Sequence, residues 1–419
     1  MRAPGVLTSR GQVFLGLGAV VALAGMALGY RDVTRVGLLL VVLPLLARLL
    51  VRAAPPTLRV QRTVTPARLN PDQAGTVEVH FTNVGKRPTP MFLAEEQFDY
   101  ALGDRPRFIL PRMAPGESRR LRYQVRSRHR GAFAVGPITL RRRDPFGLTH
   151  VALQLPATVE LLVLPYVWDL GDRRVAGQGR GTEGELPQMV SLHGEDDVSI
   201  RQYRDGDELR RVHWPATAHR GEIMVRQEDR PARRRAVLLL DSRAGAHPGT
   251  GYQVSFEWAV SAIASLARHL IKDGFVIHLL THRTVEDGSA GVQIGIDEAL
   301  ATLARAQPDQ GTSLQPLATA AHSFTSGGVL LISVVVAHDK DELANLAAVR
   351  EPGSAAMALV LDPEAFRRGD PGEGKGAEAI RHTQILTQAG WQTVLVGPQD
   401  SVPAAWESLR ATRRTGALT

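Results

Sequence analysis

Two apolar runs dominate the N-terminal region. The first, residues 13–30, contains no charged side chain, and as a helix it would be about 27 Å long, close to the hydrocarbon thickness of a bilayer. The second, residues 36–51, is shorter and carries Pro44 and Arg48, whose long side chain can reach the headgroups from a helix end. Only residues 30–35 connect the runs. The pattern predicts an anchor of two transmembrane helices that form a hairpin.

A cleaved signal peptide is the alternative interpretation, since Gly25-Met26-Ala27 offers small residues for a cleavage site. The second apolar run follows at once, which favours the anchor. Basic residues near a membrane stay on the cytoplasmic side, and more arginines flank the two ends of the hairpin than lie in its connecting loop. We therefore expect a multi-pass plasma-membrane protein with its soluble domains on the cytoplasmic side.

After residue 55 the apolar pattern changes to a period of two. Residues 57–65 and 76–82 alternate polar with apolar or β-branched side chains, as half-buried strands do. Residues 121–126 and 137–140 have the same pattern, and turn residues such as Asn70-Pro71-Asp72 separate the strands. Short strands at this spacing predict an antiparallel, immunoglobulin-like β-sandwich over residues 55–168.

From residue 235 onward, strand-like and helix-like patterns alternate. Residues 236–241 form a continuous apolar run that ends in Asp241, which is typical of a buried parallel strand. Further strands are expected at 275–280, 328–336, 356–361 and 391–396, and helices at 252–272, 298–306, 314–323, 340–349 and 378–389. This alternation predicts an α/β domain with a parallel sheet over residues 235–419. The anchor then occupies residues 1–54, and residues 169–234 form a linker.

The linker contains one formal match to a dinucleotide-binding fingerprint, at residues 179–184. No apolar strand leads into it, and no amphipathic helix follows to offer its N-terminus to a pyrophosphate. We therefore do not expect a nucleotide there.

The amino-acid composition excludes several kinds of site and limits the kinds of partner. The chain has no cysteine, which excludes disulfides, thiolate catalysis and cysteine-based zinc sites. Its net charge is +8, but only four of the 50 basic residues are lysine, as a GC-rich genome would produce. The charge permits anionic lipid or nucleic acid as a partner.

Residues 201–235 contain ten arginines, and acidic residues are interspersed among them. A nucleic-acid surface would be arginine-dominated with stacking aromatics, so ion pairs within the protein are the simpler interpretation, and we expect no nucleic acid. His213 and His219 are six positions apart and share no helix face, which favours structural roles. No phosphate-binding loop, zinc-protease motif or nucleophile elbow is present, so we expect no enzyme and no cofactor.

Within the linker, residues 199–218 resemble the signature of the bacterial domain-of-unknown-function family 58. Residues 130–133, 136–137 and 144–148 are similar to an upstream motif of the same family. Pro215 and His219 depart from its usual residues. The matching or adjoining signature residues, where we expect a partner to bind, are Arg201, Tyr203, Gly206, Asp207, Arg210, Arg211, Trp214 and Ala218.

The resemblance implies that the C-terminal domain is a von Willebrand factor type A-like domain. The metal site of such domains takes oxygen ligands from Asp-x-Ser-x-Ser, a threonine and a second aspartate, a donor set that suits magnesium. The corresponding positions here are Asp241, Arg243, Gly245, Thr312 and Val334. Both serines and the second aspartate are therefore lost, and we expect no metal.

The resemblance also implies a function. Proteins of this family look like membrane-anchored adaptors that work with a MoxR-type AAA+ ATPase, and also with membrane transglutaminase-like proteins, in the assembly or maturation of other proteins. An outward-facing, adhesion-type A domain that needs a divalent ion is the alternative. Nucleic-acid binding at the membrane is a third possibility, and it requires steep salt dependence.

Overall fold

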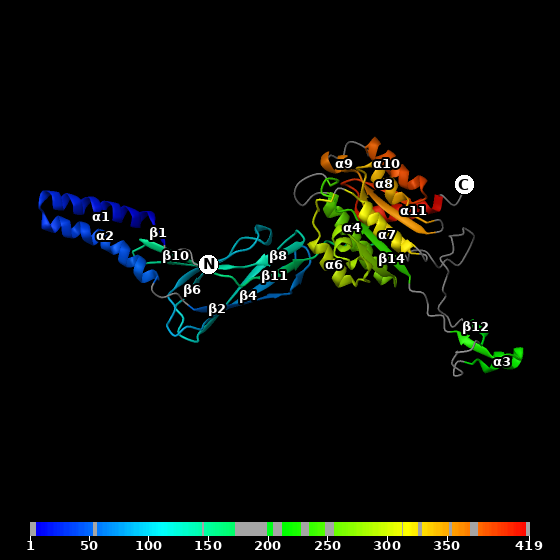
Figure 1. Ribbon diagram of the computed structural model, residues 1–419, viewed down its shortest axis with the longest axis horizontal. Coiled ribbons are helices and arrows are strands. Elements are labelled where there is room, and N and C mark those ends of the chain that lie inside the picture. Colours follow the sequence, from blue (N-terminus) through cyan, green and yellow to red (C-terminus); the bar gives the residue numbers. More distant parts are fainter. Residues whose placement is uncertain are drawn as a thin grey trace. The chain divides into compact units, whose positions relative to one another are not determined.

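The computed structural model describes residues 6–52, 57–144, 146–171, 199–203, 212–227, 234–247, 255–311, 313–325, 329–351, 354–368 and 376–415. The chain divides into two compact units, Met1–Pro165 and Tyr166–Thr419, which we call the N-terminal and the C-terminal unit (Figure 1). Four segments were expected from the sequence, and their boundaries stay predictions.

Two helices begin the N-terminal unit and lie side by side (Figure 1). Helix α1 (Ser9–Leu28) and helix α2 (Arg31–Arg52) are joined by Gly29 and Tyr30. Small residues let their backbones approach closely, as in membrane helix pairs. A Cβ atom on Gly37 of α2 would lie 2.3 Å from the backbone nitrogen of Ala22 in α1, so only glycine fits there.

Among the described residues one helix, α1, is long and apolar enough to cross a membrane, by length and composition. A signal sequence near the N-terminus would meet the same criterion. The expectation of a multi-pass protein therefore has support for one helix only. The predicted connection at residues 30–35 is wrong, because α2 begins at Arg31 and includes the Asp32–Arg35 ion pair at 3.0 Å, one helical turn apart.

The rest of the N-terminal unit is built from β-strands. Their predicted period of two is confirmed: in β4, Val77, Val79 and Phe81 are fully buried and the residues between them are partly exposed. Three sheets form, β1-β10-β9-β5-β6, β2-β4-β7 and β3-β11-β8, and all pairs are antiparallel except β3 with β11. The immunoglobulin-like arrangement stays a prediction. The strands are β1 (Val6–Leu7), β2 (Leu58–Thr65), β3 (Arg68–Leu69), β4 (Ala74–Asn83), β5 (Phe92–Glu96), β6 (Arg107–Leu110), β7 (Ser118–Arg126), β8 (Gly131–Val135), β9 (Ile138–Arg143), β10 (Thr149–Leu155) and β11 (Val159–Val163).

The C-terminal unit contains the predicted parallel sheet, with helices on both faces. Alternate residues of the strand Arg235–Leu240 belong to different cores: Leu238 and Leu240 join one apolar cluster, and Val237 and Leu239 join the other. A strand buried on both faces reads as a continuous apolar run, which is why the sequence predicted these strands. The strands are β14 (Arg235–Leu240), β15 (Val276–Leu280), β16 (Leu330–Val336), β17 (Ala355–Leu361) and β18 (Gln392–Val396).

Eight helices accompany these strands in the described part of the C-terminal unit. Three of them were not predicted: α5, α9 and α11. Helix α11 closes the chain and places Trp406, fully buried, against the core that also holds Phe256 of α4. The helices are α4 (Ser255–Lys272), α5 (His282–Glu286), α6 (Ile296–Arg305), α7 (Gln315–Thr325), α8 (Lys340–Ala347), α9 (Pro363–Arg368), α10 (Ala377–Gln388) and α11 (Val402–Thr415).

The strand order of this sheet is β15-β14-β16-β17-β18, and every neighbouring pair is parallel. In chain order this is 2-1-3-4-5, one of the two common doubly wound orders. The order reverses between β14 and β16, and open α/β sheets bind ligands outside the carboxyl ends of strands at such a switch point. The residues that follow β14 and β16 therefore form the candidate ligand-binding position of this sheet.

A small arm, formed by β12 (Ser199–Gln202), α3 (Trp214–Arg220) and β13 (Met224–Gln227), precedes the sheet in the sequence. The sequence of this arm also predicts a short helix over residues 209–214 with Asp207 as its cap; residues 204–211 lie outside the described residues, and Trp214 begins α3. His213 caps this helix, because its Nδ1 accepts a hydrogen bond from the backbone nitrogen of Ala216 at 3.1 Å. Residues 179–184, with the formal nucleotide fingerprint, also lie outside the described residues.

Candidate functional site

Asp241 directly follows β14 at the switch point, and its side chain is fully buried. Its Oδ1 accepts hydrogen bonds from Nε of Arg243 at 2.9 Å and from the backbone nitrogen of Arg243 at 3.2 Å. Its Oδ2 accepts from Nη2 of Arg243 at 2.8 Å and from the backbone nitrogen of Val336 at 3.2 Å. Four N–H groups therefore hold the two oxygens, and the guanidinium pairs with the carboxylate in the bidentate geometry that arginine favours.

The charges of this pair stabilise each other. Burial by itself raises the pKa of Asp241, but the hydrogen bonds and positive charge of Arg243 outweigh it and hold the pKa of the carboxyl below its usual range. Burial likewise disfavours the cation, yet Asp241, helped by the nearby charges of Glu342 and Asp339, raises the pKa of Arg243. Both groups are thus ionised at neutral pH, and the guanidinium is the cation that neutralises Asp241.

A second aspartate, Asp309, forms hydrogen bonds with the loop after β14. The sequence did not identify this residue. Ser242 donates a hydrogen bond from its hydroxyl to Oδ2 of Asp309. The backbone nitrogen of Asp309 donates to the Ser242 carbonyl at 2.8 Å, and that of Ala244 donates to the Asp309 carbonyl, also at 2.8 Å. Oδ1 of Asp309 accepts from the backbone nitrogen of Gly311 at 2.8 Å. The segment around Asp309 is therefore tied to the end of β14.

His247 also contacts this loop, and the sequence did not identify this residue either. Its Nε2 lies 2.8 Å from the Asp241 carbonyl oxygen, and its Nδ1 lies 2.8 Å from Oγ of Ser255. Burial lowers the pKa of His247, so a neutral ring donates from Nε2 and accepts from the serine hydroxyl. Ser255 is fully buried, so this serine and histidine form a structural contact rather than a nucleophile and its base.

The donor set of this site fits a metal poorly. All oxygen atoms of Asp241 are engaged by N–H groups, so a divalent ion would have to displace Arg243. Val334 is fully buried, and its carbonyl accepts from the Asp241 backbone nitrogen at 3.0 Å, while Gly245 is exposed and offers no side-chain oxygen. Thr312 lies outside the described residues. In the ranges that the structure describes, no group of three or more histidines and carboxylates is arranged to hold a metal.

The residues that resemble the family signature lie in or next to the arm, and one of them, Trp214, is 71 % exposed. Helix α3, which Trp214 begins, has no buried residue in the structure. Tyr203 is half-buried and donates its backbone N–H to the Ile223 carbonyl at 2.8 Å, Arg201 pairs with Val225 across the two strands, and Ala218 is exposed. The signature residues Gly206, Asp207, Arg210 and Arg211 lie outside the described residues.

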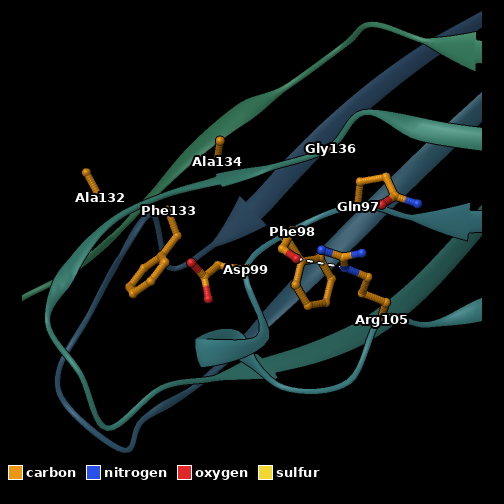
Figure 2. A pocket seen from close by; sticks show the side chains of 8 residues that line it. All are labelled: Gln97, Phe98, Asp99, Arg105, Ala132, Phe133, Ala134 and Gly136. Atoms are coloured by element: carbon orange, nitrogen blue, oxygen red, sulfur yellow. Dashed lines mark hydrogen bonds between the residues drawn. The ribbon is translucent and has the colours of Figure 1, made fainter. Parts of the chain in front are cut away.

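The N-terminal unit contains a cavity of about 380 Å³ (Figure 2). Its two charged lining residues are already engaged. Asp99 accepts from the backbone nitrogen of Ala101 at 2.8 Å, and Arg105 donates from Nε to the Phe98 carbonyl at 2.9 Å and lies over the ring of Tyr100. These contacts hold the 97–105 loop, so we assign this cavity no chemical role.

The C-terminal unit is thus a doubly wound α/β unit. The Asp241–Arg243 ion pair occupies the position at its switch point where such sheets bind ligands. Residues 199–357 match the model of the family described as "Protein of unknown function DUF58". The chain is also 25 % identical, over 156 residues, to "Uncharacterized protein YeaD" of Bacillus subtilis (strain 168), and the match covers 36 % of each protein. It therefore spans about a third of that relative's length.

Two solved structures resemble parts of the chain only weakly. The CARDB domain of a Pyrococcus furiosus protein is 19 % identical and matches 26 % of this chain and 89 % of its own, with a TM-score of 0.20. The putative ApaA protein of Bordetella pertussis is 18 % identical and matches 26 % of this chain and 95 % of its own, with a TM-score of 0.21. Likenesses at these scores carry no argument about this chain.

Proposed function

We propose that this chain is a membrane-anchored, non-enzymatic protein-interaction protein that binds its partner through the arm and the switch-point loops of the C-terminal unit. The observation that carries the proposal is the exposure of Trp214 on a helix with no buried residue. Tryptophan is enriched among the residues that dominate binding energy at interfaces. A seven-residue helix is too short to be stable by itself, so packing against a partner would stabilise α3.

The ion pair at the switch point supports binding through polypeptide rather than through a metal. An adhesion-type A domain needs a divalent ion at the position that the Arg243 guanidinium occupies beside Asp241. We retain the von Willebrand factor A-like assignment as part of the proposal. Its support is the parallel sheet with an aspartate at the end of its first strand.

We further propose that α1 anchors the chain in the membrane and that α2 returns it to the starting side. The 20 residues of α1 rise about 30 Å, the thickness of a hydrocarbon core. The close contacts of Gly37 with Ala22 keep the second helix against the first. The soluble parts would then lie on the cytoplasmic side, where an ATPase has access to them.

The proposed partner class, a MoxR-type AAA+ ATPase with a membrane transglutaminase-like protein as a further candidate, comes from the family resemblance. The test uses the full chain in detergent or nanodiscs and measures its affinity for such an ATPase. We expect Trp214→Ala to weaken binding by about 2 kcal/mol, roughly 30-fold, without lowering the thermal midpoint.

The matched control is Val292→Ala, which removes a side chain of similar exposure, 61 %, from another part of the C-terminal unit. Equal affinity of the wild type and Trp214→Ala would reject the arm as the binding surface. Absence of binding by the wild type would reject the ATPase as the partner.

A further inference from the structure

The start of α1 is bonded to a turn that lies far along the chain and whose described residues are Asp144 and 146–149; we call it the 144–149 turn. Thr8, the N-cap of α1, donates its backbone N–H to the Leu148 carbonyl at 2.9 Å and its hydroxyl to the Gly147 carbonyl at 2.7 Å. The contact is so close that a Cβ on Gly11 would lie 2.2 Å from the Leu148 carbonyl oxygen. The turn therefore sits directly on the first turn of α1.

The 144–149 turn is itself well ordered by hydrogen bonds. Asp144 is buried, and its Oδ2 accepts from the backbone nitrogen of Phe146 at 3.0 Å, while its Oδ1 accepts from the hydroxyl of Thr149 at 3.1 Å. Gly147 has a φ of +68°, a conformation that favours glycine. Leu148 is buried. Phe146, however, is 62 % exposed, so a hydrogen-bonded turn presents an aromatic ring to its surroundings.

The geometry of α1 sets the depth at which this ring lies. The helix is about as long as the hydrocarbon core is thick, so a spanning α1 must have its ends at the two membrane surfaces. Ser9 is its first residue, and Thr8, bonded to the turn, comes immediately before it. Tryptophan and tyrosine concentrate at this level of the bilayer, and phenylalanine is also common on segments that lie there. The exposed Arg10 lies where it can contact anionic headgroups.

We propose that the 144–149 turn is a lipid-contacting element, and that Phe146 inserts its ring among the headgroups beside the base of α1. This inference rests on the proposed membrane anchorage. Lipid is the occupant that the structure favours, because the turn is continuous through Thr8 and Gly11 with the helix that enters the bilayer. The turn thereby fixes the N-terminal unit directly against the membrane surface, with no flexible linker at this point.

The absence of cysteine allows a direct test with single-cysteine variants of the full chain, each labelled with an environment-sensitive fluorophore. Val20→Cys places the label within α1, Phe146→Cys places it on the turn, and Tyr100→Cys provides the control. Tyr100 is an aromatic residue of similar exposure, 69 %. It lies toward the other end of β9, since neighbouring Gln97 bonds Pro137 at the start of that strand.

The labelled variants are reconstituted into phosphatidylcholine vesicles that contain phosphatidylglycerol, with nitroxide quenchers placed either at the headgroup or deep in the acyl chain. We expect the emission maximum of the label at 146 to shift to shorter wavelength, and we expect the headgroup nitroxide to quench this label. The label at 20 should be quenched by the deep nitroxide, and the label at 100 by neither.

The outcomes separate the two proposals. A quenched label at 20 with an unquenched label at 146 would overturn the lipid contact and leave the anchor in place. An unquenched label at 20 would overturn the anchor itself. Equal quenching at 146 and 100 would show general adsorption of the N-terminal unit and would also overturn the specific contact. Circular dichroism of each variant confirms that the labelled chain is folded.

Discussion

Among the described residues, each unit has an arginine–carboxylate pair with both side chains buried, and the two pairs differ in charge state. In both, the closest nitrogen–oxygen distance is 2.8 Å and the side chains are almost fully buried. Arg243 holds the pKa of Asp241 below its usual range, whereas burial raises the pKa of Glu96 to about 7 despite the charge of Arg62. The distance between the partners therefore does not determine whether a buried carboxyl is charged.

The number of N–H donors explains the difference. Both oxygens of Asp241 accept two hydrogen bonds each, half of them from the backbone. Glu96 receives one bond from Arg62 on Oε1, and its Oε2 is buried with no hydrogen-bond partner among the described residues. Nη1 of Arg62 donates to the Ala157 carbonyl instead, and its Nε has no hydrogen-bond partner among the described residues. Fewer donors leave the cost of burial uncompensated, so Glu96 holds its proton near neutral pH.

The largest effect is expected when the better-satisfied pair is broken. Arg243→Met leaves the buried Asp241 without its cation and with half of its hydrogen-bond donors, and should lower the free energy of unfolding of the C-terminal unit by about 3–5 kcal/mol. All five tryptophans lie in that unit, so urea unfolding followed by their fluorescence reports on it alone. Arg283→Met, at an exposed position, is the matched control.

A double variant distinguishes the buried charge from lost packing. Asp241→Asn combined with Arg243→Met removes both charges and should recover much of the loss. If Arg243→Met alone lowers the free energy of unfolding by less than about 1 kcal/mol, the account of Asp241 given above is wrong.

The second effect is a pH dependence of the N-terminal unit. The pKa of Glu96 is raised from 4.5 to about 7, so the folded state holds more protons than the unfolded state between these values. The stability from this group is complete below pH 4.5 and is lost as the pH rises through 7, a decrease of about 3 kcal/mol. Hydrogen exchange of the β4 amides, corrected for its intrinsic pH dependence, measures this change in the free energy of unfolding. If Glu96→Gln shows the same dependence of stability on pH, another group causes it.

A smaller effect is expected from Arg62→Met, the counterpart of the Arg243 variant. Glu96 can take up a proton once its cation is lost, so no isolated charge stays buried. At pH 6 the N-terminal unit should lose about 1–2 kcal/mol, the range for a buried hydrogen bond. Hydrogen exchange of the same amides gives the value. A loss as large as that for Arg243→Met would contradict the contrast between the two pairs.

The smallest effect is expected on the thermal midpoint when magnesium is added. In the wild type, the Arg243 guanidinium occupies both oxygens of Asp241, so millimolar magnesium should leave the thermal midpoint of the C-terminal unit unchanged. Arg243→Ser with Gly245→Ser supplies two hydroxyl oxygens, and its midpoint should rise with magnesium, because a ligand that binds only the folded state stabilises it. Magnesium stabilisation of the wild type that a chelator reverses would show that Asp241 is available to a metal.

The sequence predicted the elements whose apolar pattern is local. The buried strands of the C-terminal sheet and the alternating strand β4 are where the pattern placed them. Helix α11 was not predicted, although Val402, Ala405, Trp406 and Leu409 repeat at helical spacing and are all buried in the structure.

The site was predicted only in part, because its contacts join distant segments. Asp241 and Arg243 lie two residues apart, and their proximity could be read from the sequence. Asp309, which binds Ser242, is 67 residues away, and no local pattern marks it. Glu96 ends the stretch Phe92–Glu96, where strict alternation fails and a charged residue is fully buried, so the pattern could not predict its pairing with Arg62.

The bond between Thr8 and Gly147 also has a consequence for biosynthesis. The two residues are 139 positions apart, so the ribosome adds the turn on the order of 10 s after the helix it supports. During that interval α1 and α2 have emerged and the edge of β1 has no neighbour. On the proposed anchorage, α1 therefore enters the bilayer before the sheet is complete, and a chain that stalls before residue 144 carries α1 and α2 without the turn that contacts them.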